Sequence, residues 1–151
     1  EVDAARAAAL FGRACEGGLP LACNNLGSLH RDGAGVAKDE LGAMKLFQRA
    51  CDGGDPSGCR NLGMLYVEGR GVAKGMAPAG VWFEKACDGG DAAGCRLYGA
   101  MLVDGFGVAK DELRGKQLLA QACRHGEQLA CKVMLDRGWA TKKAAGTGTG
   151  G

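Results

Sequence analysis

The sequence has few aromatic residues and almost no imbalance of charge. Only 5% of the 151 residues are Phe, Trp or Tyr, and the formal net charge at pH 7 is +2. Proteins that bind nucleic acids usually show a basic face or a set of aromatic side chains on which bases stack. The composition supplies neither feature, so we expect no nucleic-acid partner.

Long apolar runs and a leader are missing as well. No run approaches the roughly 18 residues needed to cross a bilayer, so we expect no membrane span. The first residues, EVDAARAAALFGRAC, lack the charged region and the cleavage site of a signal peptide. We therefore expect that an export signal, if the protein has one, lies in upstream residues missing from this segment.

Motifs of several enzyme classes are also absent. There is no H-E-x-x-H, no Walker loop and no C-x-x-C, and GRGVAKG spaces its glycines wrongly for a dinucleotide site. A serine acyl-enzyme site would need S-x-x-K and K-T-G elements, whereas the only serines, Ser28 and Ser57, begin SLHR and SGCR. We predict no catalytic residue, no cofactor and no metal.

Cysteine, by contrast, is frequent and regularly spaced. Four C-x7-C pairs recur with a shift of 36 residues, and they are Cys15 and Cys23, Cys51 and Cys59, Cys87 and Cys95, and Cys123 and Cys131. The flanking residues fall into the same register. A period of this length indicates a solenoid, in which each unit buries its apolar face only against its neighbours.

Within a unit the apolar residues have helical spacing. Ala43, Leu46, Phe47 and Ala50 stand at i, i+3, i+4 and i+7. The glycines of DGGD end this helix, and a second one begins near Pro56. We predict an all-α, right-handed solenoid of paired antiparallel helices over residues 1–138, with units at about 3–38, 39–74, 75–110 and 111–138, and a disordered Gly/Thr-rich tail at 139–151.

One glycine recurs in the middle of the second helix of three units. These are Gly27, Gly63 and Gly99. A glycine there costs about 1 kcal/mol relative to alanine. We therefore expect two backbones to approach closely at these positions.

The predicted hairpin places the two cysteines of a pair on either side of a tight turn. This arrangement suits a disulfide, whose Cα atoms stand roughly 4.4 to 6.8 Å apart. Closing such a loop contributes about 2.5 kcal/mol in the chain-entropy model. Two alternatives stay open, namely a zinc site, for which the chain offers only His30 and His125, and reduced, buried cysteines in a cytosolic protein.

The segment NLGMLYVEGRGVAK, followed by AGVWFEKACDGGD, resembles the Sel-one-like repeat, a relative of the tetratricopeptide repeat. The cysteine pairs are similar to those of the secreted cysteine-rich proteins first described in Helicobacter. The last unit departs from the pattern, because Leu135 replaces the glycine and the DGxGVAK loop is absent. The resemblance implies a scaffold that holds a partner protein or peptide in a concave groove, in a secreted or periplasmic location. Some cysteine-rich members are described as weak penicillin binders or β-lactamases, which is the alternative function.

A polar ladder marks the residue that follows the second cysteine of each unit. It reads Asn24, Arg60, Arg96 and Lys132, with Asn25 and Asn61 beside it. By analogy with tetratricopeptide domains, these side chains would face the groove and bind an acidic or carboxyl-terminal peptide. The alternative is a solvated surface without a ligand. We expect a monomer, and a third class of function, a haem or metal carrier, would show itself by absorbance or metal analysis.

Overall fold

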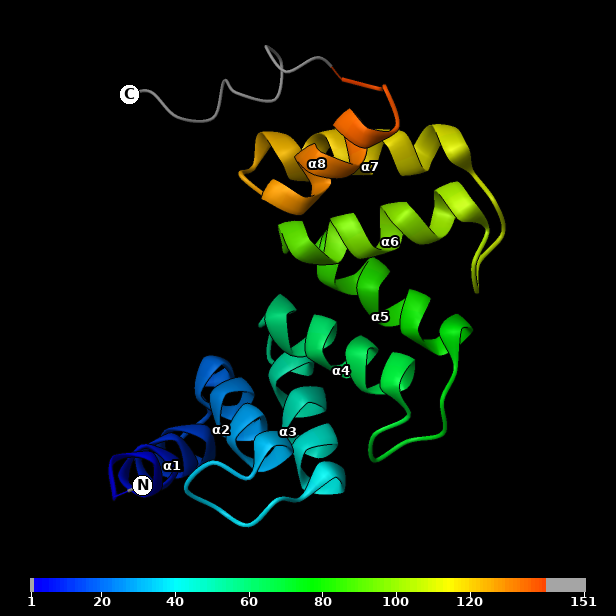
Figure 1. Ribbon diagram of the computed structural model, residues 1–151. Coiled ribbons are helices and arrows are strands. Elements are labelled where there is room, and N and C mark those ends of the chain that lie inside the picture. Colours follow the sequence, from blue (N-terminus) through cyan, green and yellow to red (C-terminus); the bar gives the residue numbers. More distant parts are fainter. Residues whose placement is uncertain (1, 141–151) are drawn as a thin grey trace, which may run out of the picture.

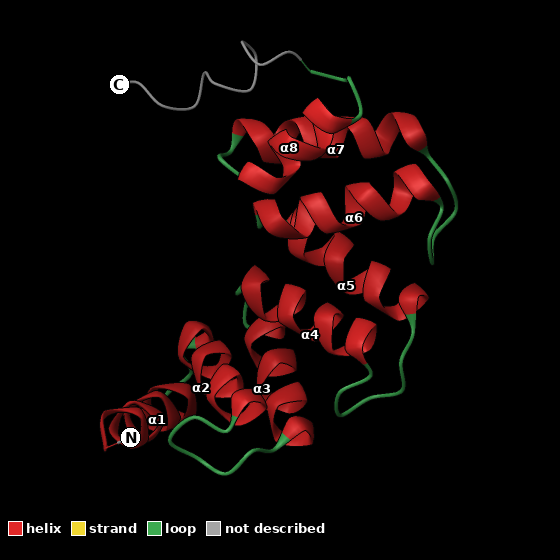
Figure 2. Cartoon of the chain, in the orientation of Figure 1, coloured by secondary structure: helices red, strands yellow, loops and turns green. Residues whose placement is uncertain are grey.

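The computed structural model describes residues 2–140, and every regular element in that range is an α-helix. Figure 2 shows helices joined by loops in a single crescent. The helices are α1 (Val2–Glu16), α2 (Pro20–Asp32), α3 (Glu40–Asp52), α4 (Pro56–Glu68), α5 (Met76–Asp88), α6 (Ala92–Asp104), α7 (Glu112–Arg124) and α8 (Gln128–Asp136). The prediction of an all-α solenoid of four helix pairs is confirmed. Residues 141–151 of the predicted tail lie outside the described residues.

The ends of the helices follow from local sequence. The Asp39 side chain caps α3 by accepting a hydrogen bond from the Gly42 backbone N–H at 2.8 Å, which satisfies a donor that the helix leaves free. Pro56 opens α4, where its missing N–H costs nothing. Gly69 ends the same helix with φ of 70°, in the left-handed region that favours glycine. Caps of these kinds keep most helices at 13 residues.

A disulfide closes each hairpin near the three-residue corner that joins its two helices. The structure pairs Cys15 with Cys23, Cys51 with Cys59, Cys87 with Cys95, and Cys123 with Cys131. The Cα atoms of each pair stand 4.3 to 4.7 Å apart. The predicted local pairing is confirmed, and among the described residues no cysteine is free and no cluster of side chains could hold a metal.

The core lies between units as much as within them. The predicted apolar face of α3 is buried, with Ala43, Phe47 and Ala50 fully shielded from solvent. Trp82 of α5 is partly buried against the preceding unit, where it packs on the cluster that contains Phe47 and on the buried pair Cys51 and Cys59. The first helices α3, α5 and α7 therefore each pack on their own partner and on the second helix of the preceding unit.

The mid-helix glycines allow this packing, although the neighbour differs from the one expected. A Cβ atom on Gly27 would lie 2.8 Å from the Phe47 ring, and one on Gly63 would lie 2.6 Å from the Phe83 ring. In these two places the glycine receives an aromatic side chain rather than another backbone. Only Gly99 shows the predicted approach of backbones, with the Gly115 carbonyl oxygen 3.0 Å from the added Cβ.

The last unit ends in a packed tryptophan. Trp139, which falls in the predicted tail, packs against the apolar cluster that contains Leu119. Lys116 Nζ lies 4.5 Å from the ring centroid, and the Arg137 guanidinium lies 5.4 Å from it. Arg137 also pairs with Asp104 at 3.0 Å. Trp139 thereby covers part of the last core cluster.

The disulfides lead to a first prediction. Replacing both Cys51 and Cys59 by alanine should lower the free energy of unfolding by about 2.5 kcal/mol, because the open loop gains conformational entropy in the unfolded chain. Urea titrations of the wild type and the variant would measure this. Adding reductant should destabilise the wild type by more than the variant. Superimposable wild-type curves with and without reductant would contradict a stabilising role.

Candidate functional site

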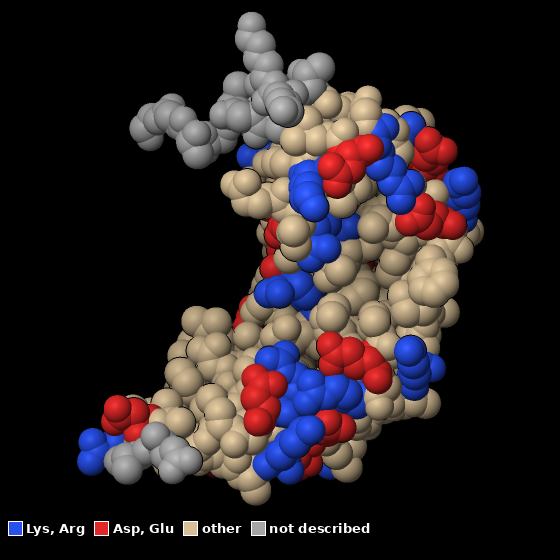
Figure 3. Space-filling view, viewed as in Figure 1, with Lys and Arg blue, Asp and Glu red and all other residues tan. Residues whose placement is uncertain are grey.

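The hairpin corners lie along the inner side of the crescent, and the long loops between units lie along its outer side. Figure 1 shows the four corners turned toward the opening, while the loops before α3, α5 and α7 face away from it. Figure 3, a space-filling view, shows that the same side is hollowed. The predicted ladder residues are each the fifth residue of α2, α4, α6 and α8, so they lie about one turn from the corners.

The two arginines of the ladder are paired within the chain. Arg60 Nε lies 2.8 Å from Asp91 Oδ2, and Arg96 Nε lies 3.3 Å from Glu127 Oε1. Neither Nε has the geometry of an aligned hydrogen bond, so these contacts are ion pairs. In each case the arginine belongs to one unit and the acid to the next, so the pairs tie successive corners together.

The acids in these pairs have a second role, which the sequence analysis missed. Asp91 caps α6 by accepting from the Gly94 backbone N–H at 2.8 Å, and Glu127 caps α8 by accepting from the Leu129 N–H at 3.1 Å. Each of these carboxylates therefore caps the N-terminus of a helix and also pairs with an arginine of the preceding unit. The signal in the sequence was the acid 31 residues after each ladder arginine.

The first step of the ladder is built differently. Asn24 is buried, with 8% of its surface exposed, and its Oδ1 accepts a hydrogen bond from Asn61 Nδ2 at 2.8 Å. Asp55 caps α4 by accepting from the Ser57 N–H and hydroxyl, but its buried Oδ2 has no partner among the described residues. An amide thus replaces the cation here, and an amide–amide bond replaces the ion pair.

The remaining ladder positions carry no such tie. Lys132 on α8 is exposed, and within residues 2–140 it forms no ion pair. Asn25 is half-buried, and its side chain forms no hydrogen bond within that range. Of the six predicted residues, the structure therefore joins Asn24 to Asn61 directly and leaves the other four at separate positions along the corners.

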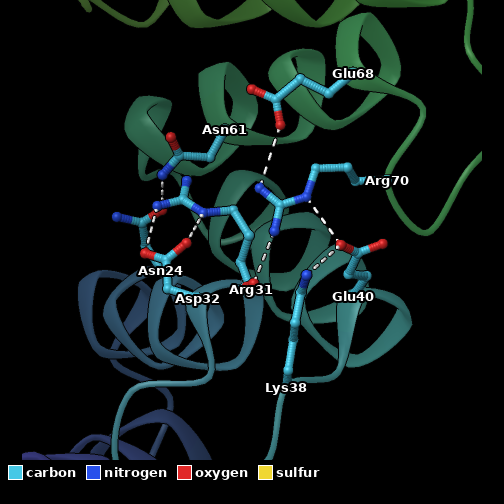
Figure 4. A network of polar contacts seen from close by, with 8 residues as sticks. All are labelled: Asn24, Arg31, Asp32, Lys38, Glu40, Asn61, Glu68 and Arg70. Atoms are coloured by element: carbon cyan, nitrogen blue, oxygen red, sulfur yellow. Dashed lines mark hydrogen bonds and ion pairs between the residues drawn. The ribbon is translucent and has the colours of Figure 1, made fainter.

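A charged cluster between the first two units was not predicted. Figure 4 shows Arg70 at its centre. The Arg70 guanidinium donates to Glu40 at 2.9 Å and to the Arg31 carbonyl oxygen at 2.8 Å, and it pairs with Glu68 at 3.3 Å. Hydrogen bonds from Arg70 and then Lys38 hold the pKa of Glu40 below its ordinary value. The residues equivalent to Arg70 in the first and third units are Ala34 and Phe106, so only a comparison of the units would have drawn attention to Arg70.

Neither serine is arranged for catalysis. The Ser57 hydroxyl donates to Asp55 at 2.6 Å as part of the helix cap, and the Ser28 side chain has no hydrogen bond among the described residues. His30 is half-buried, and its Nδ1 lies 3.3 Å from the Ala37 carbonyl oxygen. Within the described range, no helix is both long and apolar enough to cross a membrane.

Comparison with protein families identifies the repeat. A model described as Sel1 repeat matches residues 1–19, 20–55, 56–91 and 92–127. The chain belongs to the Sel1 repeat family. Each full match joins the second helix of one unit to the first helix of the next, half a unit out of phase with the hairpins described above. No curated protein sequence matches significantly.

Three solved structures share this fold. A protective antigen of uropathogenic Escherichia coli displaying an SLR fold is 31% identical, with a TM-score of 0.79 over 87% of this chain. A Sel1 repeat protein from Oxalobacter formigenes is 27% identical, with a TM-score of 0.85 over 91%. Cysteine rich protein B of Helicobacter pylori is 28% identical, with a TM-score of 0.70 over 87%. The chain spans 28%, 59% and 94% of these proteins, respectively.

The cysteine-rich character separates this chain from the general repeat. A disulfide in every unit, together with the similarity to the Helicobacter protein, confirms the predicted resemblance to the cysteine-rich branch. Disulfides persist in oxidising environments outside the cytoplasm. The Sel1 chain is thus suited to an oxidising, extracytoplasmic compartment.

The ladder pairs lead to a second prediction. Replacing Arg60 and Arg96 together by alanine should lower the free energy of unfolding by about 1 to 2 kcal/mol, because both inter-unit ion pairs are lost and each is only partly exposed. Urea titration measures the change. Arg49→Ala is the matched control, since Arg49 is exposed and without an ion pair among the described residues, and a change within about 0.5 kcal/mol is expected. Equal effects would contradict the tie between corners.

Proposed function

We propose that the protein is a non-enzymatic scaffold that holds a segment of a partner protein along the inner side of its crescent. The observation that carries this proposal is the hollow side itself, lined by four disulfide-closed corners. A rigid surface loses little conformational entropy when it binds, so more of the contact energy appears as affinity. Membership of the Sel1 repeat family supports the same role.

The two ends of the inner side differ in chemistry. At the first corner Leu19 and Leu21 are 53% and 55% exposed, and Leu19 stands where the other units place an acidic helix cap. At the last corner Leu129 is 54% exposed as well, but Arg124, His125 and Lys132 add exposed polar side chains, and none of these three forms an ion pair within the described residues. A partner segment with apolar residues at one end and carboxylates at the other would match this arrangement.

Of the six residues predicted as binding contacts, five remain proposed contacts with the partner, because Asn24 is buried and bonded to Asn61. Lys132 is free to pair with a carboxylate. Arg60 and Arg96 expose 32% and 23% of their side chains, and each guanidinium has further N–H groups beyond the Nε that faces the acid. These groups, with the amides of Asn25 and Asn61, would hold an acidic segment through charge-assisted hydrogen bonds. We propose that the protein acts as a monomer in a secreted or periplasmic location.

The last corner gives the test of this function. The probe is a labelled 12-residue peptide with three leucines at its start and four glutamates at its end, and Lys132→Gln should weaken its binding about twofold to fivefold, because one exposed ion pair is lost. Fluorescence anisotropy measures the affinity, which should also fall as salt is added. Lys74→Gln is the matched control, since Lys74 is exposed in the loop between α4 and α5.

Two outcomes would overturn the proposal. One is an equal loss of affinity in Lys132→Gln and Lys74→Gln, which would show that the peptide responds to net charge alone. The other is equal binding, or no binding, of the peptide and of its counterpart with glutamine in place of glutamate. Neither substitution should change the melting temperature, because both lysines are exposed.

A further inference from the structure

We propose that the outer face of α1 is a docking surface for the second helix of one more Sel1-type unit. This face is formed by Ala7, Leu10, Phe11 and Ala14, which follow the helical spacing i, i+3, i+4 and i+7. Leu10 is 63% exposed and the other three are half-buried. An apolar stripe on an exposed helix face is typical of a contact surface.

The equivalent residues of the other three units show how this face packs when a neighbouring helix covers it. The residues equivalent to Phe11 are Phe47, Phe83 and Leu119, and each is at most 1% exposed. The residues equivalent to Ala14 are Ala50, Ala86 and Ala122, and these too are at most 1% exposed. These two positions are therefore fully buried in three units and only half-buried on α1, where Phe11 and Ala14 still pack against the cluster that contains Ala22 and Cys23.

In the other three units the stripe is covered by the same kind of helix. The second helix of the preceding unit packs against each stripe, as α2 packs on α3, α4 on α5 and α6 on α7. In two of them a glycine faces the aromatic ring, with Gly27 against Phe47 and Gly63 against Phe83. The occupant of the α1 face is accordingly a helix that brings a glycine over Phe11.

A second copy of this chain does not offer such a helix at its C-terminal end. In α8 the glycine position is occupied by Leu135, and Trp139 packs against the last core cluster. A leucine at this position would meet the Phe11 ring where the other units leave room only for a hydrogen atom. Head-to-tail association of identical chains is thus disfavoured, and a unit with the glycine is favoured.

The test adds such a unit to the chain. A copy of residues 39–74 is joined directly before Asp3, so that the new junction reads GVAKD, as it does before Glu40. The added second helix then presents its copy of Gly63 to Phe11 in the register set by the 36-residue repeat. Amide hydrogen exchange in residues 7–14 should slow at least tenfold relative to the unextended chain, because local opening of α1 would have to break the new contact.

A matched extension separates docking from a mere increase in length. In the control the copied Gly63 is replaced by leucine, which favours the helix but cannot fit against Phe11, and exchange in α1 should stay at the unextended rate. Equal protection by both extensions, or by neither, would overturn the proposal. So would slower exchange of the unextended chain at higher concentration, since a second copy would then be the occupant. The result is independent of peptide binding on the inner side.

Discussion

The fold depends on the close approach of each second helix to the first helix of the next unit. That approach requires a residue without a side chain at one position, because the ring of Phe47 or Phe83 occupies the space that a Cβ atom would need. A solenoid has no central core, so its stability is the sum of unit stabilities and of contacts between neighbours. Glycine at this position lowers the helix propensity, but it permits the contact that joins neighbouring units.

The disulfides and the ladder ion pairs both hold the helices in place, the disulfides within a unit and the ion pairs between units. Each disulfide fixes one hairpin near its corner, and the pairs of Arg60 with Asp91 and Arg96 with Glu127 join one corner to the next. Together they line the inner side of the crescent with short, closed turns. A surface fixed in this way suits a scaffold, because a partner segment meets contacts that are already in place.

The sequence predicted the architecture well because the architecture is local. The 36-residue period, the glycine-rich corners and the cysteine spacing each report on contacts within one unit or with its neighbour. The pairing of the ladder arginines was not predicted, because a capping acid such as Asp91 reads as a local helix signal and its distance from Arg60 depends on how the units stack. The Arg70 cluster was missed for the same reason, since it joins three helices across two units.

Calorimetry of Gly63→Leu tests the central contact most directly. A Cβ atom at this position would lie 2.6 Å from the Phe83 ring, so the substitution should uncouple the first two units from the last two. The account predicts that the wild type unfolds in one transition, whereas the variant unfolds in two or with a van't Hoff enthalpy well below the calorimetric one. Gly12→Leu, where a Cβ meets nothing within 4 Å, should keep the wild-type behaviour. A single, unshifted transition in Gly63→Leu would contradict the account.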